Sequence, residues 1–105
     1  METIILNLIT NSGEAKSYAM EAIAFAKEQN FEAAYGALEA SGKSLSLAHR
    51  SQTTLIQSEA GGEKVELSML LIHAQDHLMN ATTAKDLASE MVQLYEVVYQ
   101  KLSQR

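Results

Sequence analysis

The segment Leu70-Leu71-Ile72-His73-Ala74-Gln75-Asp76-His77-Leu78-Met79 decides how the rest of the sequence is interpreted. It places two imidazoles and one carboxylate within five residues of an otherwise apolar stretch. Successive residues of a helix turn by about 100°, so His73, Asp76 and His77 share one face within an arc of about 100°. Polar side chains on an apolar helix are costly unless they are paired, bound to a metal or used for chemistry. Three of them on one face favour chemistry over a set of solvated residues.

This segment lies in a long predicted helix. The chain has no helix breaker between a start near Glu63 to Val65 and Leu102, which predicts a helix of roughly 38 residues. One apolar stripe of this helix consists of Leu67, Leu71, Ala74, Leu78, Ala81, Ala88, Val92, Tyr95 and Tyr99. The second stripe consists of Met69, Leu87, Met91, Leu94 and Val98, and His73, Asp76, Asn80 and Thr83 continue its line.

The two stripes predict different contacts, one within the chain and one between copies of it. One stripe is enough to pack a helix against two partners of its own chain. The second predicts self-association along this helix, which would bring copies of Asp76 together at the symmetry axis. The alternative is one wide stripe that serves a single three-helix bundle.

Two further helices are predicted before the long one, over residues 2–28 and 31–60. Asn30 is a plausible N-cap of the second, and Gly61-Gly62 ends it. Asn11-Ser12-Gly13 predicts either a kink in the first helix or a close approach by another helix. The second helix carries a stripe of Phe31, Tyr35, Leu38, Gly42, Leu45, His49, Gln52 and Ile56. His49 is interpreted as a hydrogen-bonded histidine of this stripe rather than as a ligand.

Composition limits the class of protein. With 105 residues the chain is expected to form one domain, 1–105, and the absence of Pro favours long helices. The absence of Cys excludes disulfides, thiolate nucleophiles and Cys-based zinc sites. A net charge of −5 argues against a nucleic-acid partner. Residues 1–10 do not form a signal peptide and no apolar run has the length of a membrane span, so we expect a soluble cytoplasmic protein without membrane insertion.

Three functions fit the histidine segment. The first is a phosphoryl carrier, since neutral imidazole is nucleophilic near pH 7 and such a carrier needs little more than one accessible histidine. The second is a zinc hydrolase, because His73-x-x-Asp76-His77 is similar to the inverted zinc motif with Asp in place of Glu. That function needs a third ligand from elsewhere and a substrate cleft. The third is a structural oligomerisation module whose polar layer sets register.

A family resemblance distinguishes these alternatives. The segment from His73 to Met79 resembles the active-site signature of the lactose/cellobiose-type enzyme IIA of the bacterial phosphoenolpyruvate-dependent sugar phosphotransferase system. The resemblance extends over nearly the whole chain, in the expected order. It includes Ser12-Gly13-Glu14-Ala15-Lys16-Ser17, Ala48-His49-Arg50-Ser51-Gln52-Thr53, Leu55-Ile56-Gln57 and Ala60-Gly61-Gly62. The chain departs from the family after Met79, where residues 80–83 are more polar than usual.

The resemblance implies an all-α fold, a three-helix antiparallel bundle that assembles as a homotrimer along the third helix. It implies that His73 accepts phosphate from the histidine-containing phosphocarrier protein and passes it to a cysteine of enzyme IIB. Asp76 matches the trimer-axis aspartate that binds a divalent cation, which we expect to be magnesium. Gln75 and His77 match positions near the phosphate. The transported sugar, a disaccharide such as lactose or cellobiose, is selected in this system by the membrane component IIC.

Overall fold

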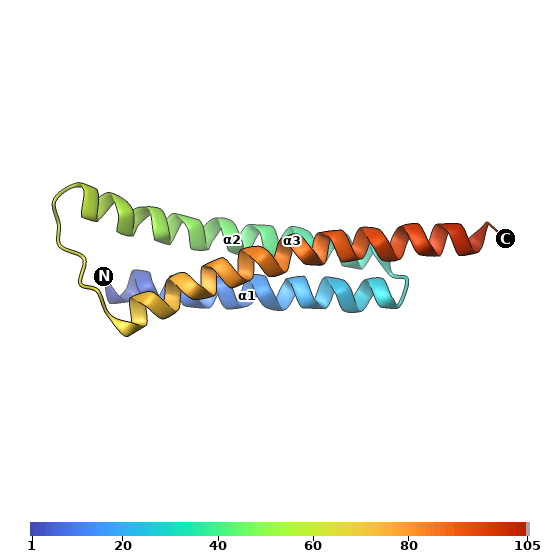
Figure 1. The fold of residues 1–105 in the computed structure, drawn as a ribbon, viewed down its shortest axis with the longest axis horizontal. Helices are drawn as coiled ribbons and strands as arrows, with labels where there is room; N and C mark the ends of the chain where they lie inside the picture. Colours follow the sequence, from blue (N-terminus) through green and yellow to red (C-terminus); the bar gives the residue numbers. More distant parts are fainter. Residues whose placement is uncertain (105) are drawn as a thin grey trace.

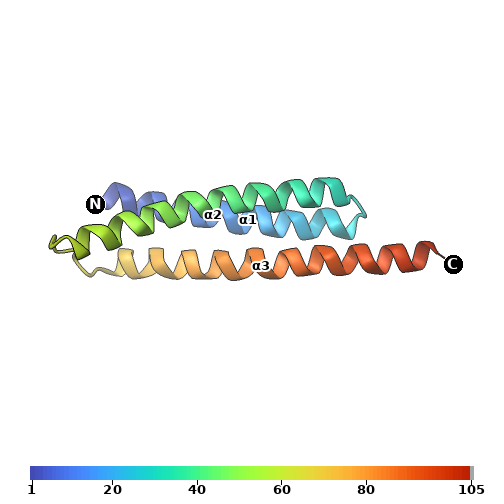
Figure 2. The ribbon, with the colours of Figure 1, turned by 90° about the horizontal axis from the view of Figure 1, so that it is seen from above.

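The computed structural model describes residues 1–104 as three helices. Helix α1 spans Glu2–Lys27, α2 spans Phe31–Ala60 and α3 spans Met69–Ser103. They form an antiparallel bundle with extents of 63 × 19 × 16 Å. Helices α1 and α2 lie side by side, and α3 crosses one face of that pair (Figure 1, Figure 2). The predicted all-α, three-helix architecture is confirmed.

The ends of α1 and α2 follow their local sequence. Asn30 is the N-cap of α2, and its side-chain oxygen accepts a hydrogen bond from the backbone N–H of Ala33 at 3.3 Å. After Ala60 the chain turns through Gly61 and Gly62, and Gly62 has a φ of +95°, which glycine adopts without steric cost. The predicted cap and the predicted stop are both confirmed.

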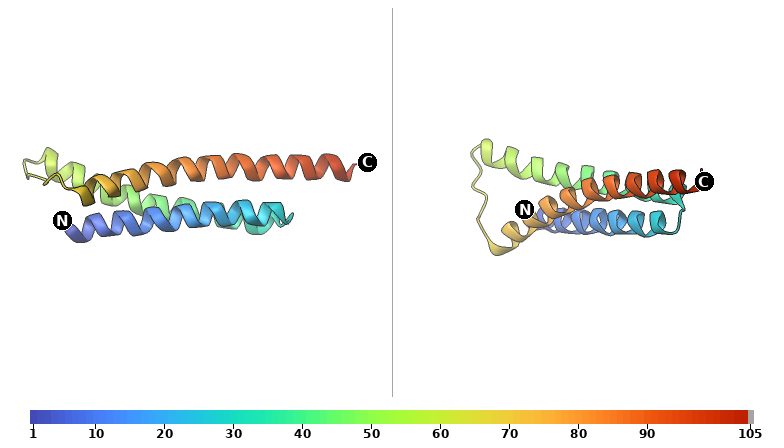
Figure 3. Two further views of the ribbon diagram at one scale, coloured as in Figure 1. Left: turned by 60° about the horizontal axis from the view of Figure 1, so that its bottom comes forward. Right: turned by 45° about the vertical axis from the view of Figure 1, so that its right-hand side comes forward.

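The predicted start of the third helix was wrong. Helix α3 begins at Met69 rather than near Glu63 to Val65, and it has 35 residues. Ser68 is its N-cap, with Oγ accepting from the backbone N–H of Leu71 at 3.1 Å. Residues 63–68 instead bridge the separated ends of α2 and α3 (Figure 3). Leu67, which was predicted to join the first stripe, lies outside the helix and is 77% exposed.

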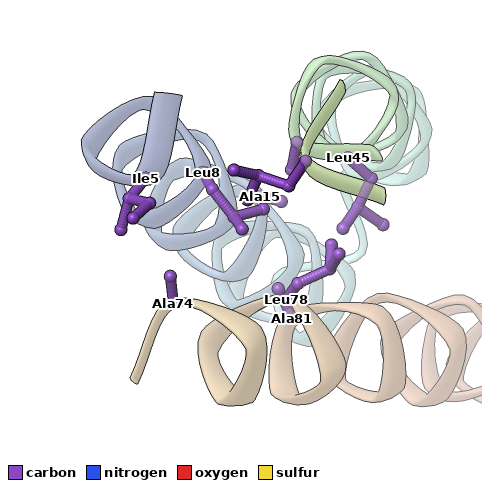
Figure 4. Packing of buried hydrophobic residues seen from close by; sticks show 9 residues of the cluster. Ile5, Leu8, Ala15, Leu45, Ala74, Leu78 and Ala81 are labelled. Carbon is purple, nitrogen blue, oxygen red and sulfur yellow. The ribbon is translucent and has the colours of Figure 1, made fainter. Parts of the chain in front are cut away.

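The core is built largely from small side chains. Two buried clusters run along the bundle; alanines are four of the nine residues of one and six of the eight residues of the other. Figure 4 shows one of them, where Leu8 and Ala15 of α1, Leu45 of α2 and Leu78 of α3 converge. Helix α1 continues through Asn11-Ser12-Gly13, and Ser12 is fully buried, so this segment marks a close approach and not a break. Small residues let the three backbones come close together.

The buried face of α2 differs from its predicted stripe. It consists of Ala34, Ala37, Leu38, Ser41, Ser44, Leu45, Ala48 and Leu55. Leu38 and Leu45 are confirmed as buried, whereas Tyr35, His49 and Ile56 are exposed. His49 is therefore not a buried histidine of the stripe. The prediction followed the large side chains, but alanine and serine fill the narrow space between the helices.

Helix α3 packs through only one of its two stripes. Ala74, Leu78, Ala81, Ala88 and Val92 of the first stripe are buried. Tyr95 and Tyr99, near the end of that stripe, are exposed, and the Tyr99 ring lies 5.7 Å from the ring of Phe31 at the start of α2. The last turns of α3 extend past the turn between α1 and α2 (Figure 2). All members of the second stripe are exposed, including Met69 at 84% and Leu94 at 62%. The alternative of one wide stripe serving a single bundle is therefore contradicted by the chain's own packing.

Candidate functional site

The two histidines of the signature lie against each other on the surface of α3. His73 is exposed and His77 is half-buried. Their ring centroids are 4.4 Å apart and the rings meet edge to face at 85°. The four-residue spacing produces this contact, because residues four apart lie one above the other on a helix. An accessible imidazole with a second imidazole beside it is an arrangement suited to covalent transfer of a small group.

Asp76 lies beside this pair, on the line of the second stripe. Its side chain is exposed, and Oδ2 accepts a hydrogen bond from Nδ2 of Asn80 at 3.2 Å. Asn80 belongs to the polar segment after Met79, so the feature that departs from the family pattern contacts the carboxylate directly.

Gln75 faces the opposite side of α3. Its Oε1 accepts a hydrogen bond from Nε2 of Gln52 in α2 at 2.8 Å. Within one chain Gln75 is therefore not brought together with His73 and His77. This bond also fixes the axial alignment of the two helices, placing residues 49–54 of α2 at the level of the histidine pair. The pairing with Gln52 was not foreseen from the sequence.

A groove between α3 and α1 has His77 in its lining. We call it the α1 groove; it has a volume of about 550 Å³, and its lining includes Gly13, Glu14, Ser17, Tyr18, Glu21 and His77. No lysine or arginine lines it. The groove beside His77 is thus acidic, with Glu14 and Glu21 in its lining.

A second groove lies on α2 and has the opposite chemistry. We call it the α2 groove; it has a volume of about 490 Å³ and is lined by Ser46, His49, Arg50, Thr53 and Thr54. Sequence reasoning named Arg50 only as part of a family match, and it interpreted His49 as a histidine of the α2 stripe rather than as a ligand. The groove forms because residues three and four apart are neighbours on a helix surface, as Ser46 is to His49 and Arg50.

The hydrolase alternative finds no support in this geometry. Across residues 1–104, no group of three or more His, Cys, Asp or Glu side chains is arranged to hold a metal ion. His73, Asp76 and His77 share a face but do not converge on one point.

Within residues 1–104, no helix is long and apolar enough to cross a membrane.

Comparisons with known proteins agree with the fold and the histidine face. The family model described as "PTS system, Lactose/Cellobiose specific IIA subunit" matches residues 3–96. The lichenan-specific phosphotransferase enzyme IIA component of Bacillus subtilis is 53% identical over 98 residues, covering 93% of this chain and 89% of that protein. The N,N'-diacetylchitobiose-specific EIIA component of Escherichia coli is 42% identical over 96 residues, covering 91% and 83%.

Solved structures show the same similarity in three dimensions. The crystal structure of the cellobiose-specific enzyme IIA from Bacillus anthracis has a TM-score of 0.93 at 53% identity, covering 95% of this chain and 92% of that one. The chitobiose IIA in its solution complex with HPr, from Escherichia coli, has a TM-score of 0.81 at 40% identity, covering 93% and 95%.

Fold, histidine face and comparisons together define a helical phosphocarrier, a phosphotransferase component of a sugar uptake system. The chain belongs to the lactose/cellobiose-specific IIA family of the phosphotransferase system.

Proposed function

We propose that His73 carries the phosphoryl group. A ring nitrogen of neutral His73 attacks the phosphorus of the phosphohistidine on HPr, the histidine-containing phosphocarrier protein. The N–P bond of the donor breaks as a new N–P bond forms on His73. A cysteine thiolate of enzyme IIB then takes the group, forming an S–P bond and restoring the His73 imidazole. The observation that carries this proposal is the exposed imidazole of His73 beside His77 on the signature face of α3.

The partners follow from the family. A chitobiose IIA that shares the fold has been solved as a complex with HPr, which supports HPr as the donor for this chain. Relatives named for lichenan, chitobiose and cellobiose support a role in uptake of a disaccharide of the cellobiose or lactose kind. We place the chain in the cytoplasm, where these partners would act.

His77 and Gln75, the two residues expected near the phosphate, lie on different sides of α3. His77 contacts the His73 ring, so it can orient that ring and donate a hydrogen bond to a bound phosphoryl group. Gln75 is directed toward α2 and Gln52, so a phosphate contact by Gln75 would have to be made to another copy of the chain.

The same proposal includes a homotrimer joined along α3. The exposed second stripe supports it, because an apolar line of that length on a helix is covered by self-association in most proteins. Three Asp76 carboxylates would then approach one another on the axis. A divalent cation, magnesium by our assignment, would neutralise their repulsion, and exposed carboxylate oxygens are ligands that suit it.

The test is phosphoryl transfer from purified, phosphorylated HPr to the full chain. Wild type should accept one phosphoryl group per chain, and His73→Ala should accept none. His49→Ala and His77→Ala should still accept the group, because neither removes the nucleophile. Full acceptance by His73→Ala would refute the assignment.

A further inference from the structure

All five methionines of the chain lie on its surface, although methionine is an adaptable filler of protein cores. The buried members of the two core clusters are alanine, leucine, isoleucine and valine. Because the chain has no cysteine, the methionine thioethers are its only sulfur atoms. The exposed methionines are Met1, Met20, Met69, Met79 and Met91. A reaction at sulfur therefore changes the surface of this protein and leaves its core untouched.

Two of these methionines belong to the second stripe of α3. Met69 is 84% exposed and Met91 is 43% exposed. They lie roughly 33 Å apart along the helix axis, by the rise of an α-helix. Leu87 and Leu94, which are four and three residues from Met91, are its neighbours on the same apolar line. Both thioethers thus contribute apolar surface where copies of the chain would meet.

Oxidation of a thioether converts that apolar surface into a polar one. Hydrogen peroxide transfers one oxygen atom to the sulfur: a sulfur–oxygen bond forms, the peroxide O–O bond breaks, and the other oxygen leaves as water. The sulfur loses two electrons and the peroxide gains them. The sulfoxide oxygen is a hydrogen-bond acceptor, and burying it without a donor is costly. Leu87 and Leu94, the neighbours of Met91, have no side-chain donor to offer it.

Assembly and oxidation would compete for the same two thioethers. In a free chain Met69 and Met91 are open to solvent. In a trimer joined through the second stripe they would be covered by neighbouring copies. Since the fraction of free chains falls as the chain concentration rises, so should the rate at which these two residues react with peroxide. A chain that is oxidised while free would then be unable to rejoin the trimer.

We propose that Met69 and Met91 are oxidation sites through which a peroxide controls assembly: the oxidised chain stays folded but no longer forms the trimer. This inference rests on the trimer included in the proposed function and adds a redox control of that assembly. After treatment with hydrogen peroxide, light scattering should show the mass falling from near three times 11.5 kDa to 11.5 kDa. The helical circular dichroism signal should be unchanged, because no core residue has reacted.

Matched variants identify the sulfur atoms responsible. Leucine is close to methionine in volume, is apolar and has no sulfur, so Met69→Leu/Met91→Leu should be trimeric both before and after peroxide. Met20→Leu removes one exposed methionine of α1, outside the stripe, and should still dissociate as the wild type does. Reduction of oxidised wild type by the two methionine sulfoxide reductases, one for each sulfoxide epimer, should restore the trimeric mass.

Peptide mapping by mass spectrometry follows each methionine during the reaction. At chain concentrations below and above the midpoint of assembly, Met69 and Met91 should react more slowly in the assembled sample. Met20, on α1, should react at the same rate in both. Equal rates for Met69 and Met91 at the two concentrations would overturn the competition, because the stripe would not be covered by assembly.

The remaining outcomes are equally decisive. The inference is overturned if wild type oxidised at Met69 and Met91 keeps its trimeric mass, if it unfolds, or if reduction of its sulfoxides does not restore the trimer. It is also overturned if the double leucine variant dissociates in peroxide as the wild type does. A wild type that is monomeric before peroxide removes the trimer and this inference together. Acceptance of phosphate by His73, measured separately without peroxide, decides the phosphoryl-carrier proposal on its own.

Discussion

Ser12 is a buried hydroxyl whose removal should stabilise the protein. It is 0% exposed, and its Oγ has no hydrogen-bond partner in the described part of the chain, residues 1–104. An unsatisfied buried polar group costs about 1–3 kcal/mol, and serine is also a poorer helix former than alanine by a few tenths of a kcal/mol. Loss of the oxygen leaves a small void that offsets part of this gain. We expect Ser12→Ala to raise the free energy of unfolding by about 1–2 kcal/mol.

Ser41 provides the matched control. It is equally buried, but its Oγ donates to the backbone carbonyl of Ala15 at 2.7 Å. Ser41→Ala loses that bond and should lower the free energy of unfolding by about 0.5–1.5 kcal/mol. Each variant removes the hydroxyl oxygen of a fully buried serine, yet the two effects should have opposite signs.

Urea unfolding followed by circular dichroism measures both changes. All proteins must be compared at one chain concentration, because association makes apparent stability depend on concentration. The midpoints should move in opposite directions with unchanged slopes. If Ser12→Ala is no more stable than wild type, its hydroxyl is satisfied and the reasoning is refuted.

Three other perturbations test separate parts of the account. Leu94→Glu places a charge in the second stripe and should reduce the mass seen by light scattering from near three times 11.5 kDa to 11.5 kDa; an unchanged mass would exclude that stripe as the interface. Asp76→Leu removes the axial repulsion and should stay trimeric, with a melting temperature that chelator no longer lowers; equal chelator sensitivity in wild type and variant would remove Asp76 from the axis. The hydrogen bond to Glu96 raises the pKa of Tyr35, so its contribution is full below pH 10 and is lost as pH rises through the raised pKa. Tyr35→Phe should therefore lose less stability than wild type between pH 9 and pH 12 in urea titrations, and parallel losses would contradict that contribution.

The sequence was most informative where one strong physical rule applies. The absence of Pro predicted long helices, and Asn30 and Gly61-Gly62 predicted where α2 begins and ends. The structure has three helices, and α2 spans Phe31–Ala60 as predicted. The separation of α3 into a packed and an exposed stripe was also predicted correctly, because helical periodicity alone determines which residues share a face.

Sequence reasoning failed where several weak signals compete. The segment 63–68 contains no Gly or Pro, so the sequence did not reveal that α3 begins only after Ser68, which caps it. The alanine and serine core of α2 was missed because small residues carry little hydrophobic signal. Gln75 matched a phosphate-site position, yet its orientation depends on Gln52, a contact between helices that periodicity does not reveal.

Reaction of the full chain with phosphorylated HPr, followed by intact-mass measurement and peptide mapping under conditions that preserve phosphohistidine, tests the central claim most directly. The account predicts one added phosphoryl group per chain, located on His73. A chain that gains no mass, or that carries the group on His49 or His77 while His73 is unmodified, would contradict it.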